Sequence, residues 1–327
     1  MLRSSRSGSG GEVRALVQRA YGPVETSVGV EEVRLPAPAG ADVCVRVRYA
    51  GVNPLDWKLV EGHYKWMSKA RPPCGVGFEL AGEVHDAGRS AVRFARGARV
   101  AGLIPAFQRP PGAIAQYALV PADLLVEVPR PIPLEQAAGL PVAGLSALQM
   151  CRMAAIGPGA RVLVHGASGG VGHLATQVAR NLGGTVTATA SAAGHALVHS
   201  LGPARVADRA APARSWGGPF DAVLDCATTL APSDLEDLLA PDGRYVATTP
   251  RFPQVMVDTV LNLVRRGKRQ VLMLKPDRAD LEDLMRQVAA GTLRVVVEHA
   301  FALNDATQAL IRSRAGHVKG KLVVAIE

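Results

Sequence analysis

Long apolar runs and paired cysteines are both scarce in this sequence. No apolar stretch reaches the roughly 20 residues that a membrane-spanning helix needs. The four cysteines are widely spaced, and no Cys-x-x-Cys pair occurs among Cys44, Cys74, Cys151 and Cys226. This spacing excludes a disulfide framework and a zinc knuckle. We therefore expect no membrane segment, and reduced thiols in a cytoplasmic protein.

Dense clusters of positive charge are also lacking, although the formal net charge is +9. Arginine and lysine are spread along the chain, and the densest cluster, in residues 265–269, is short. This pattern favours a solvated surface over a nucleic-acid interface. The Ser/Gly/Arg-rich start, Met1–Gly11, is expected to be a disordered tail. A fragment of an organelle-targeting sequence is the alternative.

The first half of the chain has the pattern of a β domain. The whole chain has 327 residues, too many for one ordinary core, so two domains are expected. Apolar and polar residues alternate over Asp42–Tyr49. Similar strands are predicted at Val13–Gln18, Glu79–Val84, Ala98–Leu103 and Ala115–Val120. Short strands with Gly and Pro turns and without helices predict a barrel-like fold.

Beyond Pro133, helices and strands alternate. A helical stretch at Leu134–Ile156 is expected to break at Pro141. The alternation then runs through Arg161–His165, Val171–Leu182, Thr185–Ala190, Ala196–Leu201, Ala222–Asp225, Leu235–Leu239, Tyr245–Thr248, Val255–Val264 and Val271–Leu274. Helices at Asp277–Ala290 and Asp305–Ser313 and a strand at Lys321–Ile326 close the chain. This rhythm predicts an α/β fold with a doubly wound parallel sheet of the Rossmann type.

A glycine turn joins the predicted strand Arg161–His165 to the helix that follows. Gly166 permits the tight turn, Gly169 lets the backbone approach a pyrophosphate, and Gly172 permits close packing of helix on strand. The helix N-terminus then offers free amides and a partial positive charge to phosphates. The residues expected to bind the cofactor here are Gly166, Ser168, Gly169, Gly170, Val171 and Gly172.

The end of the next strand indicates which dinucleotide binds. NAD sites usually place an acid there to accept hydrogen bonds from the ribose hydroxyls. This chain has no acid from Ser191 to His195. A carboxylate would repel the 2′-phosphate of NADPH, whereas Ser191 can donate to it and His195 can add charge. The sequence therefore favours NADPH over NADH.

Five stretches resemble the zinc-independent quinone oxidoreductase branch, which includes enone reductases, of the medium-chain dehydrogenase/reductase superfamily. Besides the glycine turn they are Ala50-Gly51-Val52-Asn53-Pro54-Leu55-Asp56-Trp57-Lys58, Gly75-Val76-Gly77-Phe78-Glu79-Leu80-Ala81-Gly82, Leu140-Pro141-Val142-Ala143-Gly144-Leu145-Ser146-Ala147 and Gly316-His317-Val318-Lys319-Gly320-Lys321-Leu322-Val323. The similarity extends from about Val13 to Ile326.

The resemblance implies a GroES-like β-barrel catalytic domain, residues 12–133 and 277–327, around a Rossmann domain, residues 134–276. It also implies a homodimer and a cofactor-binding role for Lys321. Zinc-dependent relatives carry a catalytic Cys where this chain has Asn53, and Gly-His-Glu where it has Gly77-Phe78-Glu79. Zinc needs three or four such ligands together, so no metal site is expected.

The implied reaction is hydride transfer from NADPH to a quinone or an α,β-unsaturated carbonyl. Charge then develops on the carbonyl oxygen, which needs a donor. The candidates are Asn53, Lys58 and Tyr64. Each also has a plain structural interpretation, as a turn residue, a solvated amine and a packing aromatic. Asp56 is expected to cap the turn that holds Asn53.

Two other functions remain open at this point. One is a biosynthetic tailoring reductase on the same scaffold, because a fold does not fix a function. The other is a non-catalytic NADPH-binding structural or regulatory protein. The glycine turn and the polar candidates favour an enzyme over the second.

Overall fold

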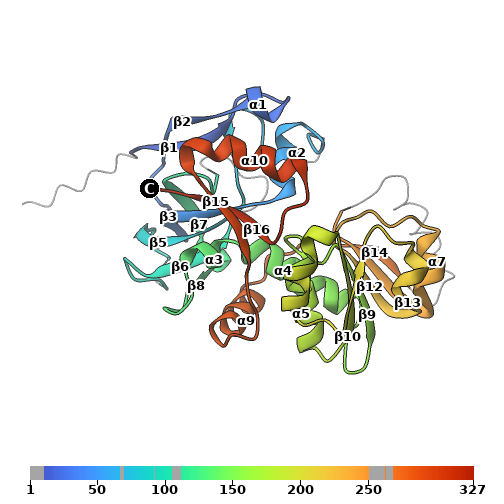
Figure 1. The fold of residues 1–327 in the computed structure, drawn as a ribbon. Coiled ribbons are helices and arrows are strands. Elements are labelled where there is room, and N and C mark those ends of the chain that lie inside the picture. Colours follow the sequence, from blue (N-terminus) through green and yellow to red (C-terminus); the bar gives the residue numbers. More distant parts are fainter. Residues whose placement is uncertain (1–10, 67–69, 92, 105–111, 250–261, 263–267) are drawn as a thin grey trace, which may run out of the picture. The chain divides into compact units, whose positions relative to one another are not determined.

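The computed structural model describes residues 11–66, 70–91, 93–104, 112–249, 262 and 268–327 (Figure 1). Contacts divide the chain into two compact units. Unit 1 comprises residues 1–141, 299–316 and 322–327, and unit 2 comprises residues 142–298 and 317–321. Of the predicted tail only Gly11 is described, and its carbonyl accepts a hydrogen bond from the Leu35 amide.

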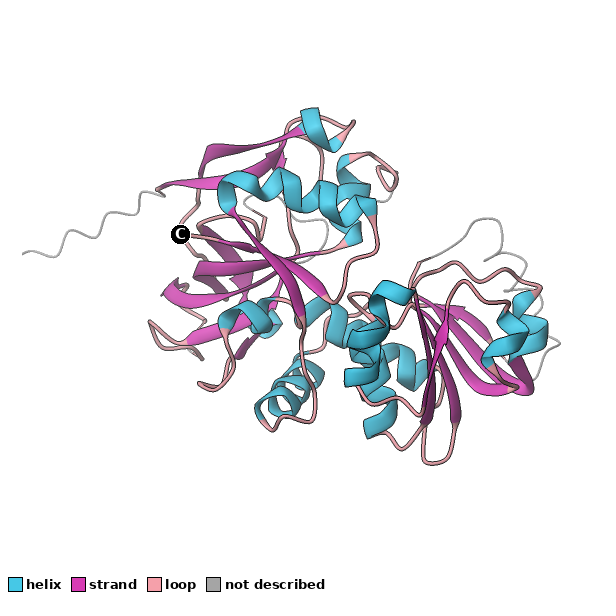
Figure 2. Ribbon diagram, in the orientation of Figure 1, coloured by secondary structure: helices cyan, strands magenta, loops and turns pink. Residues whose placement is uncertain are grey.

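Unit 1 is built from two sheets (Figures 1 and 2). The first has the order β2-β1-β4; the second has the order β15-β16-β3-β5-β6-β8, with β7 also paired to β3. The strands are β1 (Glu12–Gln18), β2 (Val28–Arg34), β3 (Asp42–Val52), β4 (Cys74–Gly75), β5 (Glu79–Ala87), β6 (Arg99–Leu103), β7 (Tyr117–Pro121), β8 (Leu125–Glu127), β15 (Val297–Ala302) and β16 (Lys321–Ala325). All five strands predicted in the first half are present, whereas β2, β4, β8 and β15 were not predicted.

Unit 1 also contains short helices. They are α1 (Val24–Ser27), α2 (Pro54–Val60), η1 (Ala122–Leu124), α3 (Leu134–Ala138), η4 (Leu303–Asp305) and α10 (Ala306–Ala315). Helix α10 packs against α1, α2 and the strands β2 and β3. The sequence predicted a turn where α2 stands, because Asn-Pro is a common turn pair. Here Asn53 precedes a proline at the first helical position, where its missing N–H costs nothing.

Unit 2 contains a six-stranded sheet in which every pairing is parallel. Its order is β11-β10-β9-β12-β13-β14, the doubly wound order expected of a Rossmann fold. The elements are α4 (Pro141–Met153), β9 (Arg161–His165), α5 (Gly172–Asn181), β10 (Thr185–Ala190), η2 (Ala192–Gly194), α6 (His195–Ser200), β11 (Arg205–Asp208), η3 (Ala213–Trp216), β12 (Phe220–Asp225), α7 (Asp234–Leu238), β13 (Leu239–Ala247), β14 (Arg269–Val271) and α9 (Arg278–Ala289). The helical stretch after Pro133 divides at Pro141, as predicted. The predicted segment Val255–Val264 lies outside the described residues except for Asn262.

Helix α9 groups with unit 2, whereas the sequence placed residues from 277 onward with the β domain. The contacts within unit 2 show why. Arg152 of α4 pairs with Asp280, and the Asn181 amide of α5 donates to Gln287 at 3.2 Å. Sequence patterning identified the helix but not the partners of its polar face.

All four cysteines are free thiols, and three of them are buried. Burial raises the pKa of Cys151 to about 12, which keeps it protonated. No helix in the described part of the chain is long and apolar enough to cross a membrane.

A buried histidine, His173, ties α5 to the segment before β15. Its Nδ1 lies 3.0 Å from the Gly169 carbonyl, and its Nε2 lies 3.2 Å from the Val296 amide nitrogen. An amide can only donate, so Nε2 accepts and Nδ1 carries the proton. Burial is the main cause that lowers the pKa of His173 from 6.5 to about 4.

This neutral histidine makes stability depend on pH. Because the folded-state pKa is the lower one, the stabilisation is complete above about pH 6.5 and is lost as the pH falls toward 4. Lowering the pH from 7.5 to 5 should remove about 2 kcal/mol of unfolding free energy through this residue, at about 1.4 kcal/mol per pKa unit. The test measures the free energy of unfolding by denaturant titration at both pH values, for the parent and for His173→Gln. The variant should show a correspondingly smaller pH dependence; an unchanged dependence would contradict the assignment.

Candidate dinucleotide and substrate sites

Two glycines of the turn between β9 and α5 are required by the packing and backbone conformation of the fold, independently of any ligand. Gly166 has φ +79°, in the region that favours glycine, and a side chain on it would stand 2.8 Å from the Ala227 Cβ. A side chain on Gly172 would overlap the Gly166 carbonyl oxygen. The close approach of helix to strand that the sequence predicted therefore rests on these two positions.

Gly169 and Gly170 are not demanded by packing. A Cβ on either would find no protein atom closer than 3.4 Å. The amides of Gly170, Val171 and Gly172 have no acceptor within the described residues. They open the ten-residue helix α5, whose N-terminus carries partial positive charge. Free amides beside glycines that no neighbour requires fit a pyrophosphate placed against the backbone.

The C-terminal part of the chain returns to this turn. The Gly320 amide donates to the Ser168 carbonyl at 2.8 Å, and the Lys321 amide donates to the Val296 carbonyl at 2.8 Å. The Lys321 side chain is buried, and its Cδ lies 3.4 Å from where a Cβ on Gly170 would stand. The structure thus brings Lys321 to the glycine turn, about 150 residues away in sequence.

The end of β10 forms a corner of small residues, Ala190–Gly194. Ser191 is half-buried at the N-cap position of η2, where its side chain makes no capping hydrogen bond, and the His195 Nε2 lies 3.2 Å from the Ala190 carbonyl oxygen. A Cβ on Gly194 would stand 2.7 Å from the Ser168 Cβ. The glycine turn and the segment that follows β10 therefore meet at Ser168 and Gly194, three residues beyond Ser191.

A buried polar network at the carboxyl ends of the strands was not predicted. The His165 ring contacts the hydroxyl oxygens of Thr189 at 2.8 Å and Thr229 at 2.7 Å. Asp225 accepts hydrogen bonds from the Tyr245 hydroxyl and the Leu230 amide. Burial is the main cause that lowers the pKa of His165. The only signal of this network in the sequence was that His165 and Asp225 each end a predicted strand.

Asn53, the first catalytic candidate, is the N-cap of α2. It forms a capping box with Asp56, whose carboxylate accepts from the Asn53 amide nitrogen at 2.6 Å. The Asn53 side-chain amide donates to the buried Glu79 at 2.8 Å. A side chain on Gly51 would overlap that carboxylate, so Gly51 makes room for it. The capping role expected of Asp56 is confirmed.

Lys58, the second candidate, lies in the last turn of α2. Asn53 and Lys58 therefore stand at opposite ends of one short helix. Lys58 is half-buried, and burial lowers its pKa. Its Nζ lies 5.6 Å from the Trp57 ring centroid. No ion pair within the described residues includes Lys58.

Trp57 adds a feature that the sequence reasoning missed. Its indole Nε1 is buried, with no hydrogen-bond acceptor among the described residues. A buried donor of this kind normally has a partner. Tyr64, the third candidate, follows α2 in a half-buried turn.

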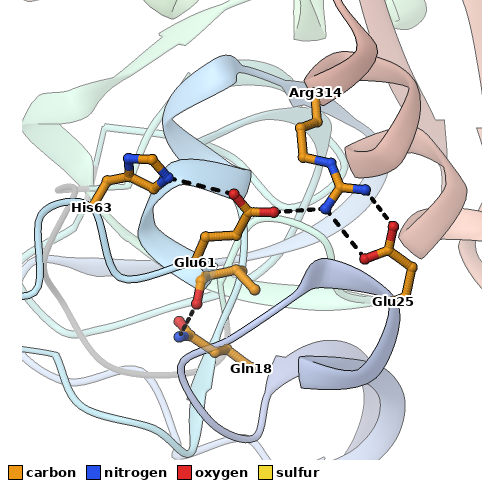
Figure 3. Close-up of polar contacts among 6 residues, drawn as sticks. Gln18, Glu25, Glu61, His63 and Arg314 are labelled. Carbon is orange, nitrogen blue, oxygen red and sulfur yellow. Dashed lines mark hydrogen bonds and ion pairs between the residues drawn. The ribbon is translucent and has the colours of Figure 1, made fainter.

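The end of α2 is fixed by an ionic cluster (Figure 3). Arg314 of α10 pairs with Glu25 of α1 and, at 2.6 Å, with Glu61 at the C-cap of α2. His63 lies 3.4 Å from the other Glu61 oxygen. The guanidinium thus joins three helices of unit 1 and holds the segment that carries Trp57 and Lys58.

Metal ligands are not grouped in the part of the chain that the structure describes: it holds no cluster of three or more His, Cys, Asp or Glu side chains suited to a metal ion. The position expected for a catalytic Cys holds Asn53, whose amide is bonded to Glu79.

Comparisons with known proteins agree on one family. Residues 39–130 match the alcohol dehydrogenase GroES-like domain, and residues 201–324 match a model described as zinc-binding dehydrogenase. A chloroplast envelope quinone oxidoreductase homolog from Arabidopsis thaliana is 31% identical over 95% of this chain and 98% of its own length. A 2-haloacrylate reductase from a Burkholderia species is 37% identical over 49% of this chain and 48% of its own.

Solved structures support the same assignment. A quinone oxidoreductase from Coxiella burnetii has a TM-score of 0.87 and 28% sequence identity, covering 97% of this chain and all of that one. The parallel sheet, the glycine turn and the GroES-like match therefore have one explanation. The chain belongs to the medium-chain dehydrogenase/reductase superfamily, in its quinone oxidoreductase branch, and is an oxidoreductase that uses a nicotinamide cofactor.

Proposed function

We propose that this chain transfers hydride from NADPH to a quinone or an α,β-unsaturated carbonyl compound, without zinc. The observation that carries the proposal is the corner at the end of β10, where no carboxylate stands between Ser191 and His195. Relatives named as a quinone oxidoreductase homolog and a 2-haloacrylate reductase support the two acceptor classes.

The cofactor would be held by the glycine turn. The amides of Gly170, Val171 and Gly172 would donate to the pyrophosphate, and Lys321 beside Gly170 would add a positive charge. Ser168, Ser191 and His195 would face the adenine ribose and its 2′-phosphate. When bound, NADPH supplies the hydride.

Lys58 is the best-supported donor to the acceptor's carbonyl oxygen. Lys58 is half-buried and takes part in no ion pair of the described residues. Its ammonium would therefore stabilise a nearby negative charge more than the ammonium of an exposed lysine does. The neighbouring Trp57 has an indole N–H without an acceptor among the described residues, which supports a polar ligand at this helix. Asn53 would position α2 through Asp56 and Glu79, and Tyr64 would contribute to the pocket wall or donate a proton.

The residues at the expected ligand positions support zinc independence. Asn53 and Phe78 replace the Cys and His of zinc-dependent relatives, and neither a carboxamide engaged by Glu79 nor a phenyl ring binds zinc. We also propose a cytoplasmic homodimer.

The reaction is tested by following NADPH oxidation at 340 nm with a panel of quinones and enones. Turnover with at least one acceptor is expected, and it should survive dialysis against a chelator. Loss of activity on chelation with recovery on adding Zn²⁺ would overturn zinc independence. Absence of turnover with every acceptor would favour a tailoring reductase with another substrate or a non-catalytic cofactor-binding protein.

Cofactor choice is tested at Ser191. Ser191→Asp should weaken NADPH binding by at least about tenfold, because the new carboxylate repels the 2′-phosphate. NADH binding should not weaken. Titration calorimetry measures both, and Ser191→Asn is the control of similar size without the charge. Equal weakening of both cofactors by the Asp variant would count against the predicted corner.

Lys58→Met removes the ammonium and keeps the length of the side chain. The hydride step, measured in single turnovers, should slow on the order of 10²-fold with little change in NADPH affinity. The parent rate should also fall as the pH rises and Lys58 loses its proton. Because burial lowers the pKa of Lys58, this fall should begin at a lower pH than for an ordinary lysine. Lys65→Met, at an exposed lysine of the following turn, is the control. A Lys58→Met rate within about twofold of the parent would transfer the role to Tyr64 or solvent.

A further inference from the structure

An arginine lies beside the corner where the 2′-phosphate would bind. Arg209 directly follows β11, and its backbone amide donates to the Ala190 carbonyl at 2.8 Å. In the parallel register Ala190 stands opposite Asp208. The backbone of Arg209 therefore adjoins the end of β10, one residue before Ser191, although 18 positions separate Arg209 from Ser191 in the sequence.

The Arg209 side chain has no anionic partner among the residues that the structure describes. It is half-buried, and no ion pair or hydrogen bond of its guanidinium occurs among the described residues. The nearby Arg205 differs, because its guanidinium donates to the carbonyls of Trp216 and Ser215. Partial burial of an unpaired charge is costly unless a ligand compensates it.

The positive charge of Arg209 also acts on His165, which ends β9. Burial is the main cause that lowers the pKa of His165, Asp225 raises it, and the positive charge of Arg209 lowers it further. Arg209 is thus close enough to the carboxyl ends of the strands to be felt there. The neighbouring Asp208 is exposed, and its carboxylate accepts from the Ala210 amide at 2.9 Å.

We propose that Arg209 binds the 2′-phosphate of NADP(H) together with Ser191 and is the main determinant of the choice between NADP(H) and NAD(H). A guanidinium suits a phosphate because it can donate two parallel hydrogen bonds to it. Small residues fill the corner on the β10 side, from Ala190 to Gly194, and leave the charge to come from β11. This inference rests on the NADPH preference proposed above and assigns its main determinant.

Calorimetric titrations with NADP⁺ and NAD⁺ test the assignment without turnover. Arg209→Met should weaken NADP⁺ binding by about thirtyfold, the loss of a charge-assisted bond, and leave NAD⁺ binding within about twofold. Arg209→Lys should lose less, because one point charge remains. Arg161→Met is the matched control, since Arg161 is exposed at the amino end of β9, the opposite edge of the same sheet. Adenosine 2′,5′-bisphosphate against AMP repeats the comparison on the fragment that carries the phosphate.

The outcomes separate this inference from the proposed function. The parent's own ratio of NADP⁺ to NAD⁺ affinity reports on the proposed cofactor, and the change from parent to variant reports on Arg209. A parent that prefers NADP⁺ while Arg209→Met keeps that preference overturns only the role of Arg209. Equal weakening of both dinucleotides would also overturn it, because it would indicate a structural residue. A parent without measurable NADP⁺ binding overturns both.

Discussion

The contact of Gly172 with the Gly166 carbonyl is the constraint on which the dinucleotide site depends. A Cβ at Gly172 would overlap that oxygen, so helix α5 could not start where it does. At this helix start the amides of Gly170, Val171 and Gly172 have no acceptor among the described residues. The parallel order of the sheet then brings the ends of β10, β11 and β12 to the same edge, where a cofactor can reach them.

Long-range hydrogen bonds from the C-terminal part of the chain hold this turn and the start of α5. Gly320 bonds to Ser168, and the Val296 amide bonds to the buried His173. The strand end that carries Lys321 therefore lies directly against the glycine turn. A neutral histidine suits the position, because a charged ring there would be buried without a carboxylate among its bonded partners.

In unit 1 the short helix α2 is also held by specific contacts, here at both of its ends. The capping box of Asn53 and Asp56 fixes the start of α2, and the pair of Arg314 with Glu61 fixes its end. Lys58 and Trp57 lie between these two anchors. A helix held at both ends gives a partly buried lysine a defined position, which electrostatic stabilisation of a developing charge requires.

The sequence by itself determined the parts of this protein whose causes are local. The glycine turn, the alternation of strands and helices and the break at Pro141 all follow from steric rules that act within a few residues. Neighbouring motifs, read together, also identified the family. The tertiary structure alone decided which distant residues meet. Lys321 beside Gly170, Arg209 beside Ala190, Glu79 on Asn53 and Asp280 on Arg152 each join segments 18 or more positions apart. No local pattern encodes such pairs, because a side chain's partner is set by how sheets and helices pack, and one sequence cannot show that without the fold.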